Sequence, residues 1–175
     1  MKIIFPLLYM FFCPYMCFSQ SDYPEPAKTN TRLFYIQHSN NHNTYVYDAN
    51  MKGGVIDSSQ PINQYQIVYT KKGIKKPLST LQRKFAYGMI LQESQPNLFK
   101  FRLAASKKIY FYLNNNEDRG PRIFVTANKR KMYLDKMFIQ LKYGFFGLKP
   151  KAEYVLFYGK DYNSGKSITE KVTME

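Results

Sequence analysis

Short stretches in which apolar and polar residues alternate run through most of this sequence, and they constrain its fold more than any other feature. Successive side chains of a strand point to opposite faces, so a strand with one face in a core must alternate. The clearest example is Phe99-Lys100-Phe101-Arg102-Leu103. Versions of the same pattern predict strands at 33–37, 44–47, 65–70, 99–103, 109–113, 123–127, 136–143, 153–158 and 168–172. We therefore predict an all-β protein, an antiparallel β-sandwich or a partly closed barrel of eight or nine strands.

One segment departs from the period of two. Ser79-Thr80-Leu81-Gln82 matches a capping box, in which the serine hydroxyl and the glutamine amide satisfy free backbone N–H groups reciprocally. Leu81 and Phe85 lie four residues apart, the spacing that places two side chains on one face of a helix. We predict one short helix over about 80–87, followed by a strand. The alternation over 85–91 leaves a strand throughout as the alternative.

The first twenty residues have the pattern of a secretory leader. Lys2 is followed by an apolar run over 3–18 that ends at small and polar residues. We predict a signal peptide over 1–20 and an exported protein, periplasmic or extracellular. The competing interpretations are a membrane anchor, for which the run is short and broken by prolines, and lipid attachment at Cys13 or Cys17. Both cysteines leave with the leader, so the mature chain would have no thiol and no transmembrane anchor.

The next residues, 21–31, are polar, contain Pro24 and Pro26 and have no periodicity. Such a composition predicts a flexible tether between the cleavage site and the fold. The remaining residues, 32–175, are one ordinary domain's length. We therefore predict a single β domain over this range.

The chain is strongly basic, with 26 Lys and Arg against 12 Asp and Glu. Such an excess attracts polyanions. An exported protein meets acidic glycans, wall polymers and lipid headgroups, so we expect an anionic polymer or glycan of the cell envelope as partner and no nucleic acid. The alternative is that scattered lysines keep a tyrosine-rich β protein soluble and protect its sheet edges.

Two groups of residues are the strongest candidates for binding. Tyr110 and Tyr112 lie opposite the inward row that contains Phe111, and aromatic rings on an exposed face can stack on sugars or peptides. Arg83 and Lys84 can hold a carboxylate or a phosphate by charge-assisted hydrogen bonds, or can cover the sheet with their aliphatic stems.

Three sequence blocks resemble an uncharacterised family, DUF4833. They are Leu33-Phe34-Tyr35-Ile36-Gln37-His38-Ser39-Asn40-Asn41, Thr44-Tyr45-Val46-Tyr47-Asp48-Ala49-Asn50 and Leu81-Gln82-Arg83-Lys84-Phe85-Ala86-Tyr87-Gly88. The resemblance extends over nearly all of the mature chain. It implies a small exported bacterial domain, and it brings no activity, cofactor or catalytic residue with it.

Signals for chemistry are weak. The chain has no Gly-x-Ser-x-Gly nucleophile motif and no cofactor motif, and we predict no catalytic residue and no cofactor. His38 and His42, with Asp48 or Asp57, are weak candidates for a metal site, because three ligands must converge and spacing alone does not bring them together.

We therefore predict a non-enzymatic binding or envelope-associated module with a basic, tyrosine-rich surface. Two alternatives stay open. One is a small hydrolase or lyase with carboxylates and basic residues in the mouth of a barrel, which would require two converging carboxylates. The other is a lipocalin-like carrier, which would require an open apolar lumen.

Overall fold

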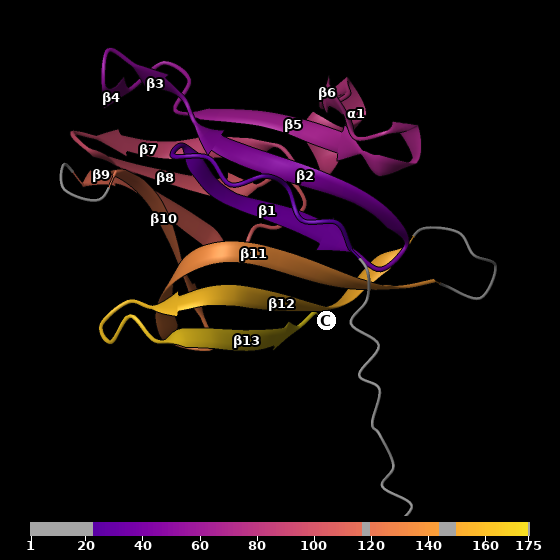
Figure 1. Ribbon diagram of the computed structural model, residues 1–175. Coiled ribbons are helices and arrows are strands. Elements are labelled where there is room, and N and C mark those ends of the chain that lie inside the picture. Colours follow the sequence, from indigo (N-terminus) through magenta and orange to yellow (C-terminus); the bar gives the residue numbers. More distant parts are fainter. Residues whose placement is uncertain (1–22, 117–119, 144–149, 175) are drawn as a thin grey trace, which may run out of the picture.

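The computed structural model describes residues 23–116, 120–143 and 150–174. The predicted signal peptide over 1–20 lies outside the described residues. The described part is made almost entirely of strands, with one α-helix, α1 (Thr80–Phe85), and a three-residue 3-10 helix, η1 (Tyr69–Lys71) (Figure 1). The prediction of an all-β fold with one short helix is confirmed. Neither described helix has the length and apolar character needed to cross a membrane.

Each of the nine segments that alternate contains a strand. These strands are β1 (Arg32–His38), β2 (Asn41–Ala49), β5 (Ile62–Val68), β8 (Leu98–Leu103), β9 (Tyr110–Asn116), β10 (Gly120–Ala127), β11 (Arg130–Lys142), β12 (Lys151–Asp161) and β13 (Ser167–Thr173). The structure adds four short strands, β3 (Met51–Lys52), β4 (Val55–Ile56), β6 (Ile74–Pro77) and β7 (Met89–Gln95). Of these, β7 is the strand expected after the helix.

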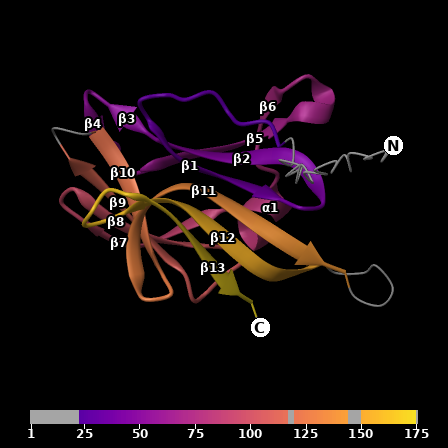
Figure 2. The same ribbon diagram turned by 60° about the horizontal axis from the view of Figure 1, so that its bottom comes forward.

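Eleven strands form one curled sheet, with the order β6-β5-β2-β1-β11-β10-β9-β8-β7 and with β12 and β13 added beside β11. The sheet branches at β11, because residues 130–133 pair with β10 and residues 136–139 pair with β1 on one edge, while β12 pairs along the other edge. The pair β1–β11 is parallel, whereas antiparallel pairs join the other strands. Figure 2 shows the resulting half-closed barrel.

The concave side of the sheet is filled with side chains. Phe34 of β1 stacks on Tyr47 of β2, with ring centroids 4.3 Å apart, and on Phe111 of β9, at 5.6 Å. These rings join strands from the two halves of the curl, and all three are fully buried. The interior is thus a packed core of the kind that closes small barrels, and it does not have the open lumen that a lipocalin-like carrier requires.

The predicted capping box is present at the start of α1. The Ser79 N–H donates to Gln82 Oε1 at 2.9 Å, and the Gln82 N–H donates to Ser79 Oγ at 3.2 Å. Leu81 and Phe85 share a helix face as predicted. That face is turned to solvent, with 70% of Leu81 and 63% of Phe85 exposed.

Residues 23–31, for which the composition predicts a tether, lie along the outer face of the sheet in front of β1 (Figure 1). Tyr23 packs edge-to-face on Phe138 of β11, with centroids 5.3 Å apart, and Pro26 is buried. Gln37 Nε2 of β1 donates to the carbonyl oxygen of Pro24 at 2.9 Å. The segment therefore covers part of the sheet that would otherwise face water.

Candidate functional site

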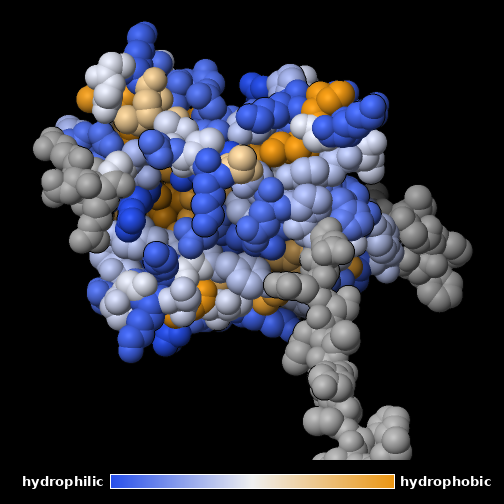
Figure 3. Space-filling view, in the orientation of Figure 1, coloured by the Kyte–Doolittle hydropathy of each residue, from blue (hydrophilic) through white to orange (hydrophobic). Residues whose placement is uncertain are grey.

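A cavity of about 950 Å³ lies between residues 23–29 and the outer faces of β1, β11 and β12. Its charged and tyrosine side chains come from both walls: Tyr23, Glu25, Lys28, Arg32, Tyr35, Asp135, Lys136, Tyr158 and Lys160. A second cavity of about 220 Å³ adjoins it and shares Arg32, Asp135 and Lys160. Figure 3 shows the hollow between the beginning of β1 and strands β10 and β11, with an apolar floor.

Two β-bulges aim consecutive residues into the cavities. In β1 the pairing with β2 shifts between Arg32 and Phe34, and in β11 the pairing with β12 shifts between Leu134 and Lys136. Neighbouring residues of a regular strand point to opposite faces, and an extra residue in a bulge removes this restriction. Asp135 and Lys136 consequently both line the larger cavity. Bulges are frequent next to functional sites, which makes this face the best candidate in the described part of the fold.

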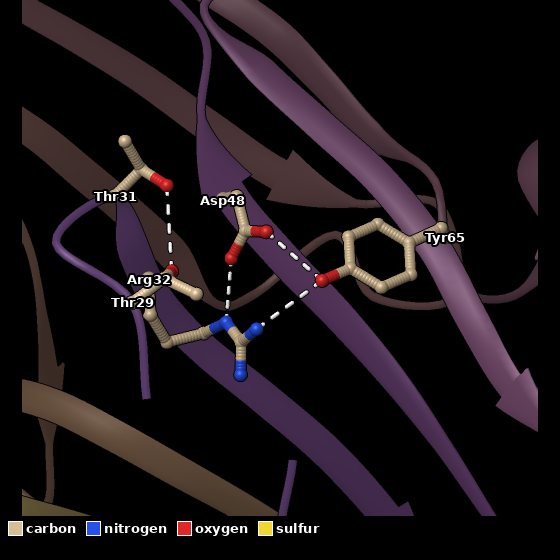
Figure 4. A network of polar contacts seen from close by, with 5 residues as sticks. All are labelled: Thr29, Thr31, Arg32, Asp48 and Tyr65. Atoms are coloured by element: carbon tan, nitrogen blue, oxygen red, sulfur yellow. Dashed lines mark hydrogen bonds and ion pairs between the residues drawn. The ribbon is translucent and has the colours of Figure 1, made fainter. Parts of the chain in front are cut away.

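Arg32 is held by a closed triangle of polar contacts (Figure 4). Its Nε donates to Asp48 Oδ1, its Nη2 donates to the Tyr65 hydroxyl at 3.2 Å, and that hydroxyl donates to Asp48 Oδ2 at 2.9 Å. The third nitrogen, Nη1, makes no hydrogen bond to any residue that the structure describes. The guanidinium is therefore fixed in orientation and keeps a donor available to a ligand.

Lys136 lies between two tyrosine rings, with its Nζ 5.7 Å from the centroid of Tyr35 and 5.6 Å from that of Tyr158. Burial lowers the pKa of Lys136, while Glu25 opposes this effect. Burial also raises the pKa of Tyr158. A cation beside two aromatic faces can hold an anionic group while the rings contact the apolar side of the same ligand.

Tyr35 is near both acidic residues of the cavity. Burial raises the pKa of Tyr35, and the negative charges of Glu25 and Asp135 raise it further. Withdrawal from water also raises the pKa of Asp135, against the effect of the neighbouring Lys160, Arg122 and Lys28. Groups with shifted pKa values thus gather on this cavity, as they do at functional sites.

A row of aromatic rings leads from β9 to the smaller cavity. Tyr112 stacks on Phe124 with centroids 5.1 Å apart, Phe124 contacts Tyr162 at 5.5 Å, and Tyr162 stacks on Tyr133 at 4.9 Å. Tyr133 lines the smaller cavity. These four residues, Tyr112, Phe124, Tyr162 and Tyr133, are called the aromatic row below.

Cations lie over the aromatic row. Lys131 Nζ is 3.6 Å from the centroid of Tyr162 and 4.1 Å from that of Phe124. Arg122, another residue of the smaller cavity, lies 5.1 Å from the centroid of Tyr133. The outer face therefore combines rings and positive charges from β9 to the cavities, as the sequence-based hypothesis of a basic, tyrosine-rich surface requires.

The predicted tyrosine pair is on this face. Phe111 is fully buried, and Tyr110 and Tyr112 point outward on either side of it. Tyr112 begins the aromatic row, and Tyr110 has Lys100 Nζ 5.0 Å from its centroid. Neither tyrosine lines a cavity described above.

The predicted basic pair is elsewhere. Arg83 and Lys84 are exposed on α1, and neither lines one of the two cavities. Lys84 Nζ lies 5.5 Å from the centroid of the Phe85 ring beside it. The structure does not bring this pair together with Tyr110 and Tyr112.

The weak metal candidates do not converge. His38 is buried and stacks with Tyr45, whereas His42 is exposed and lies against Tyr23 at 5.0 Å. Asp48 is committed to Arg32 and Tyr65. Asp57 instead accepts hydrogen bonds from Ser59 in its own turn. Within the described ranges, no three His, Cys, Asp or Glu side chains form a group that could hold a metal ion.

Sequence reasoning missed Glu25, Lys28 and Asp135 as residues of one site. The first two lie in the segment interpreted as a tether, and the third points into the cavity only because of the bulge in β11. Tyr23 beside prolines in a polar segment is the one local signal for packing against the fold, because an aromatic ring gains from burial.

Comparisons with known proteins give a family and nothing finer. No curated protein and no solved structure matches the chain. A family model described as a domain of unknown function, DUF4833, matches residues 34–171, which is most of the chain. The protein therefore belongs to the DUF4833 family.

Proposed function

We propose that this protein is an exported, non-enzymatic binding module that holds an anionic glycan of the cell envelope in the larger cavity and along the aromatic row. The observation that carries the proposal is the gathering of Lys28, Arg32, Lys136 and Lys160 beside tyrosine rings in one cavity. The cavity has the size of ordinary small-ligand sites, which are roughly 300–1,000 Å³. The predicted leader supports an envelope location.

The chemistry of an acidic sugar fits these residues. The C–H face of a sugar ring can pack on Tyr35 or Tyr158, as aromatic faces do at binding sites. Its carboxylate or phosphate can accept charge-assisted hydrogen bonds from Arg32 Nη1 and from Lys136. Further sugar units of a longer chain can lie on the aromatic row, where Lys131 and Arg122 neutralise their charge.

The test is calorimetric titration with a defined acidic oligosaccharide, oligogalacturonate, and with a neutral one, cello-oligosaccharide. We expect binding of the acidic chain that weakens as salt is added, since exposed charges are screened within about 8–10 Å at ordinary ionic strength. The double variant Lys28→Ala/Lys160→Ala should weaken this binding about tenfold or more, because two charge-assisted contacts are lost.

The matched control is Lys107→Ala/Lys108→Ala, which removes the same charge from an exposed loop before β9. It should leave the affinity within about twofold, because exposed charges away from a site contribute little. Equal loss in both double variants would reduce the effect to net charge and would contradict a site in the cavity. Equal affinity for the neutral chain would contradict an anionic ligand.

A second candidate function is a glycan hydrolase or lyase in the same cavity. The observation in its favour is that Glu25 and Asp135 both act on Tyr35, and that the pKa of Asp135 is raised, as for a general acid. Incubation with oligogalacturonate followed by chain-length analysis is the test. Shortening that disappears in both Glu25→Gln and Asp135→Asn would replace the binding proposal, whereas intact chains would exclude this reaction on this substrate.

A further inference from the structure

Helix α1 presents its apolar residues to water. Leu81 and Phe85 lie on one face and are among the most exposed large apolar side chains of the described residues, and α1 itself has no buried residue. Exposed apolar residues in a cluster indicate an interaction surface, whereas single ones are common on any protein. The arrangement needs a partner that withdraws both side chains from water.

The rest of the structure holds α1 in this orientation. Gln82 Nε2 donates to Gln66 Oε1 of β5 at 3.2 Å, so the polar face of the helix is fastened to the sheet. After the helix, Gly88 passes so close that a Cβ there would lie 1.9 Å from the Arg83 carbonyl oxygen. The Tyr87 carbonyl accepts a hydrogen bond from the buried Tyr47 hydroxyl at 2.7 Å. The outward face is therefore a fixed feature, and the helix cannot simply roll its apolar side inward.

The surroundings of α1 are strongly cationic. Residues 58–92 contain no Asp or Glu. The six cations of this range are Lys71, Lys72, Lys75, Lys76, Arg83 and Lys84. Among the described residues none of the six forms an ion pair. Figure 3 shows an apolar protrusion among hydrophilic residues at the end of the molecule that carries β6 and α1.

We propose that this end of the molecule docks on a bilayer that contains anionic phospholipid. Leu81 and Phe85 enter the boundary between headgroups and acyl chains, and Arg83 and Lys84 contact lipid phosphates. Apolar side chains flanked by basic ones are the combination that binds such interfaces, and the attraction depends on the anionic lipid. The charge of this end selects lipid over a second copy of the same chain, because two copies would bring twelve cations together.

The docking surface is separate from the proposed glycan cavity, which none of these residues lines. A protein docked through α1 would keep the cavity free to bind its ligand. Lipid binding and glycan binding can therefore be lost independently of each other.

The experiment is co-sedimentation with vesicles, using protein purified from cells that express the complete sequence. One vesicle preparation has equal parts of phosphatidylglycerol and phosphatidylcholine, and the other has phosphatidylcholine alone. We expect sedimentation with the anionic vesicles that falls as salt is added, because the lysines act through a screened field. The variant Leu81→Ser/Phe85→Ser should bind about tenfold more weakly or worse, since interfacial affinity scales with buried apolar area.

Two matched controls separate the surface from general properties of the chain. Val55→Ser removes an apolar residue that is 60% exposed in the β3–β4 hairpin and should bind as the unchanged protein does. Arg83→Gln/Lys84→Gln should weaken binding, and Lys107→Gln/Lys108→Gln, which loses the same charge elsewhere, should not. Far-ultraviolet circular dichroism checks that every variant keeps its sheet.

Three results would overturn the proposal. One is equal binding to the two vesicle preparations, and another is undiminished binding of the folded Leu81→Ser/Phe85→Ser variant. The third is a dimer in sedimentation velocity that this variant abolishes, which would identify a second copy as the occupant.

Discussion

Gly159 of β12 lies directly against the backbone of Tyr133 in β11. A Cβ atom at position 159 would be 1.9 Å from the Tyr133 carbonyl oxygen and 3.2 Å from the Cα of Leu134. The contact occurs beside the bulge at Asp135, where the pairing of β11 with β12 shifts by one residue. The absence of a side chain at Gly159 thus allows the local geometry that aims Asp135 and Lys136 into the same cavity.

Gly159→Ala should therefore destabilise the protein by about 3 kcal/mol, because the backbone must shift to admit a methyl group. Urea denaturation measures this loss. The control Gly165→Ala has open space around it and only a positive φ of 67° to oppose it, so it should lose about 1 kcal/mol. A smaller loss at 159 than at 165 would contradict the close approach. The surviving folded Gly159→Ala protein should also bind oligogalacturonate more weakly.

Asp48→Asn should lower stability and raise affinity for anions. The substitution removes the carboxylate that neutralises Arg32 and accepts from Tyr65, and breaking a partly buried pair of this kind costs about 2 kcal/mol. The freed guanidinium then carries its full charge at the cavity. Urea denaturation and calorimetry with oligogalacturonate measure the two effects, and a loss of affinity along with stability would be inconsistent with the proposed site.

Tyr47→Phe should cost about 1–2 kcal/mol, because it deletes the hydroxyl that donates to the Tyr87 carbonyl and leaves that carbonyl unpaired in a buried place. Thermal and urea unfolding give the value. Tyr110→Phe, which alters a ring at the surface, serves as the control and should change stability by less than about 0.5 kcal/mol. Equal effects of the two substitutions would show that the Tyr47 hydroxyl contributes nothing specific.

His38 should make the protein acid-sensitive. It is 2% exposed, and neither ring nitrogen has a hydrogen-bond partner with good geometry among the described residues. Burial lowers the pKa of His38 from its ordinary 6.5, and the nearby Asn40 opposes this only in part. Above pH 6.5 the ring is neutral in both states. Below it, the unfolded chain takes up a proton that the folded chain resists, so the free energy of unfolding falls as pH falls.

The variant His38→Phe keeps an aromatic ring between Tyr45 and Tyr87, and its stability should vary less between about pH 6.5 and 5. The control His42→Asn alters an exposed residue and should keep the slope of the unchanged protein. Urea titrations at several pH values decide the matter. An unchanged slope in His38→Phe would mean that another group is responsible.

Tyr110→Ser/Tyr112→Ser should distinguish short ligands from long ones. Both rings lie on the outer face beyond the cavities, so a ligand that fills only the larger cavity should keep its affinity. A longer oligogalacturonate that reaches the aromatic row should bind about fivefold to tenfold more weakly, since each lost stacking contact is worth roughly 1 kcal/mol. Equal affinity for all chain lengths would restrict the site to the cavity.

Local features of the sequence were sufficient to predict the elements of this fold. The alternation at Phe99-Lys100-Phe101 and at Phe111 predicts which side chains are buried, because the two faces of a strand follow from backbone geometry alone. The capping box at Ser79 predicts the start of α1 for the same reason, since its hydrogen bonds join residues three apart.

The candidate site was decided by tertiary structure. Arg32 meets Asp48 through the register of β1 with β2, and Tyr35 meets Lys136 through a parallel pair between segments about a hundred residues apart. No local pattern encodes such pairings, and a one-residue shift in register turns a side chain to the opposite face. The bulges, the branch at β11 and the packing of residues 23–31 depend on the whole sheet, and together they form the cavity.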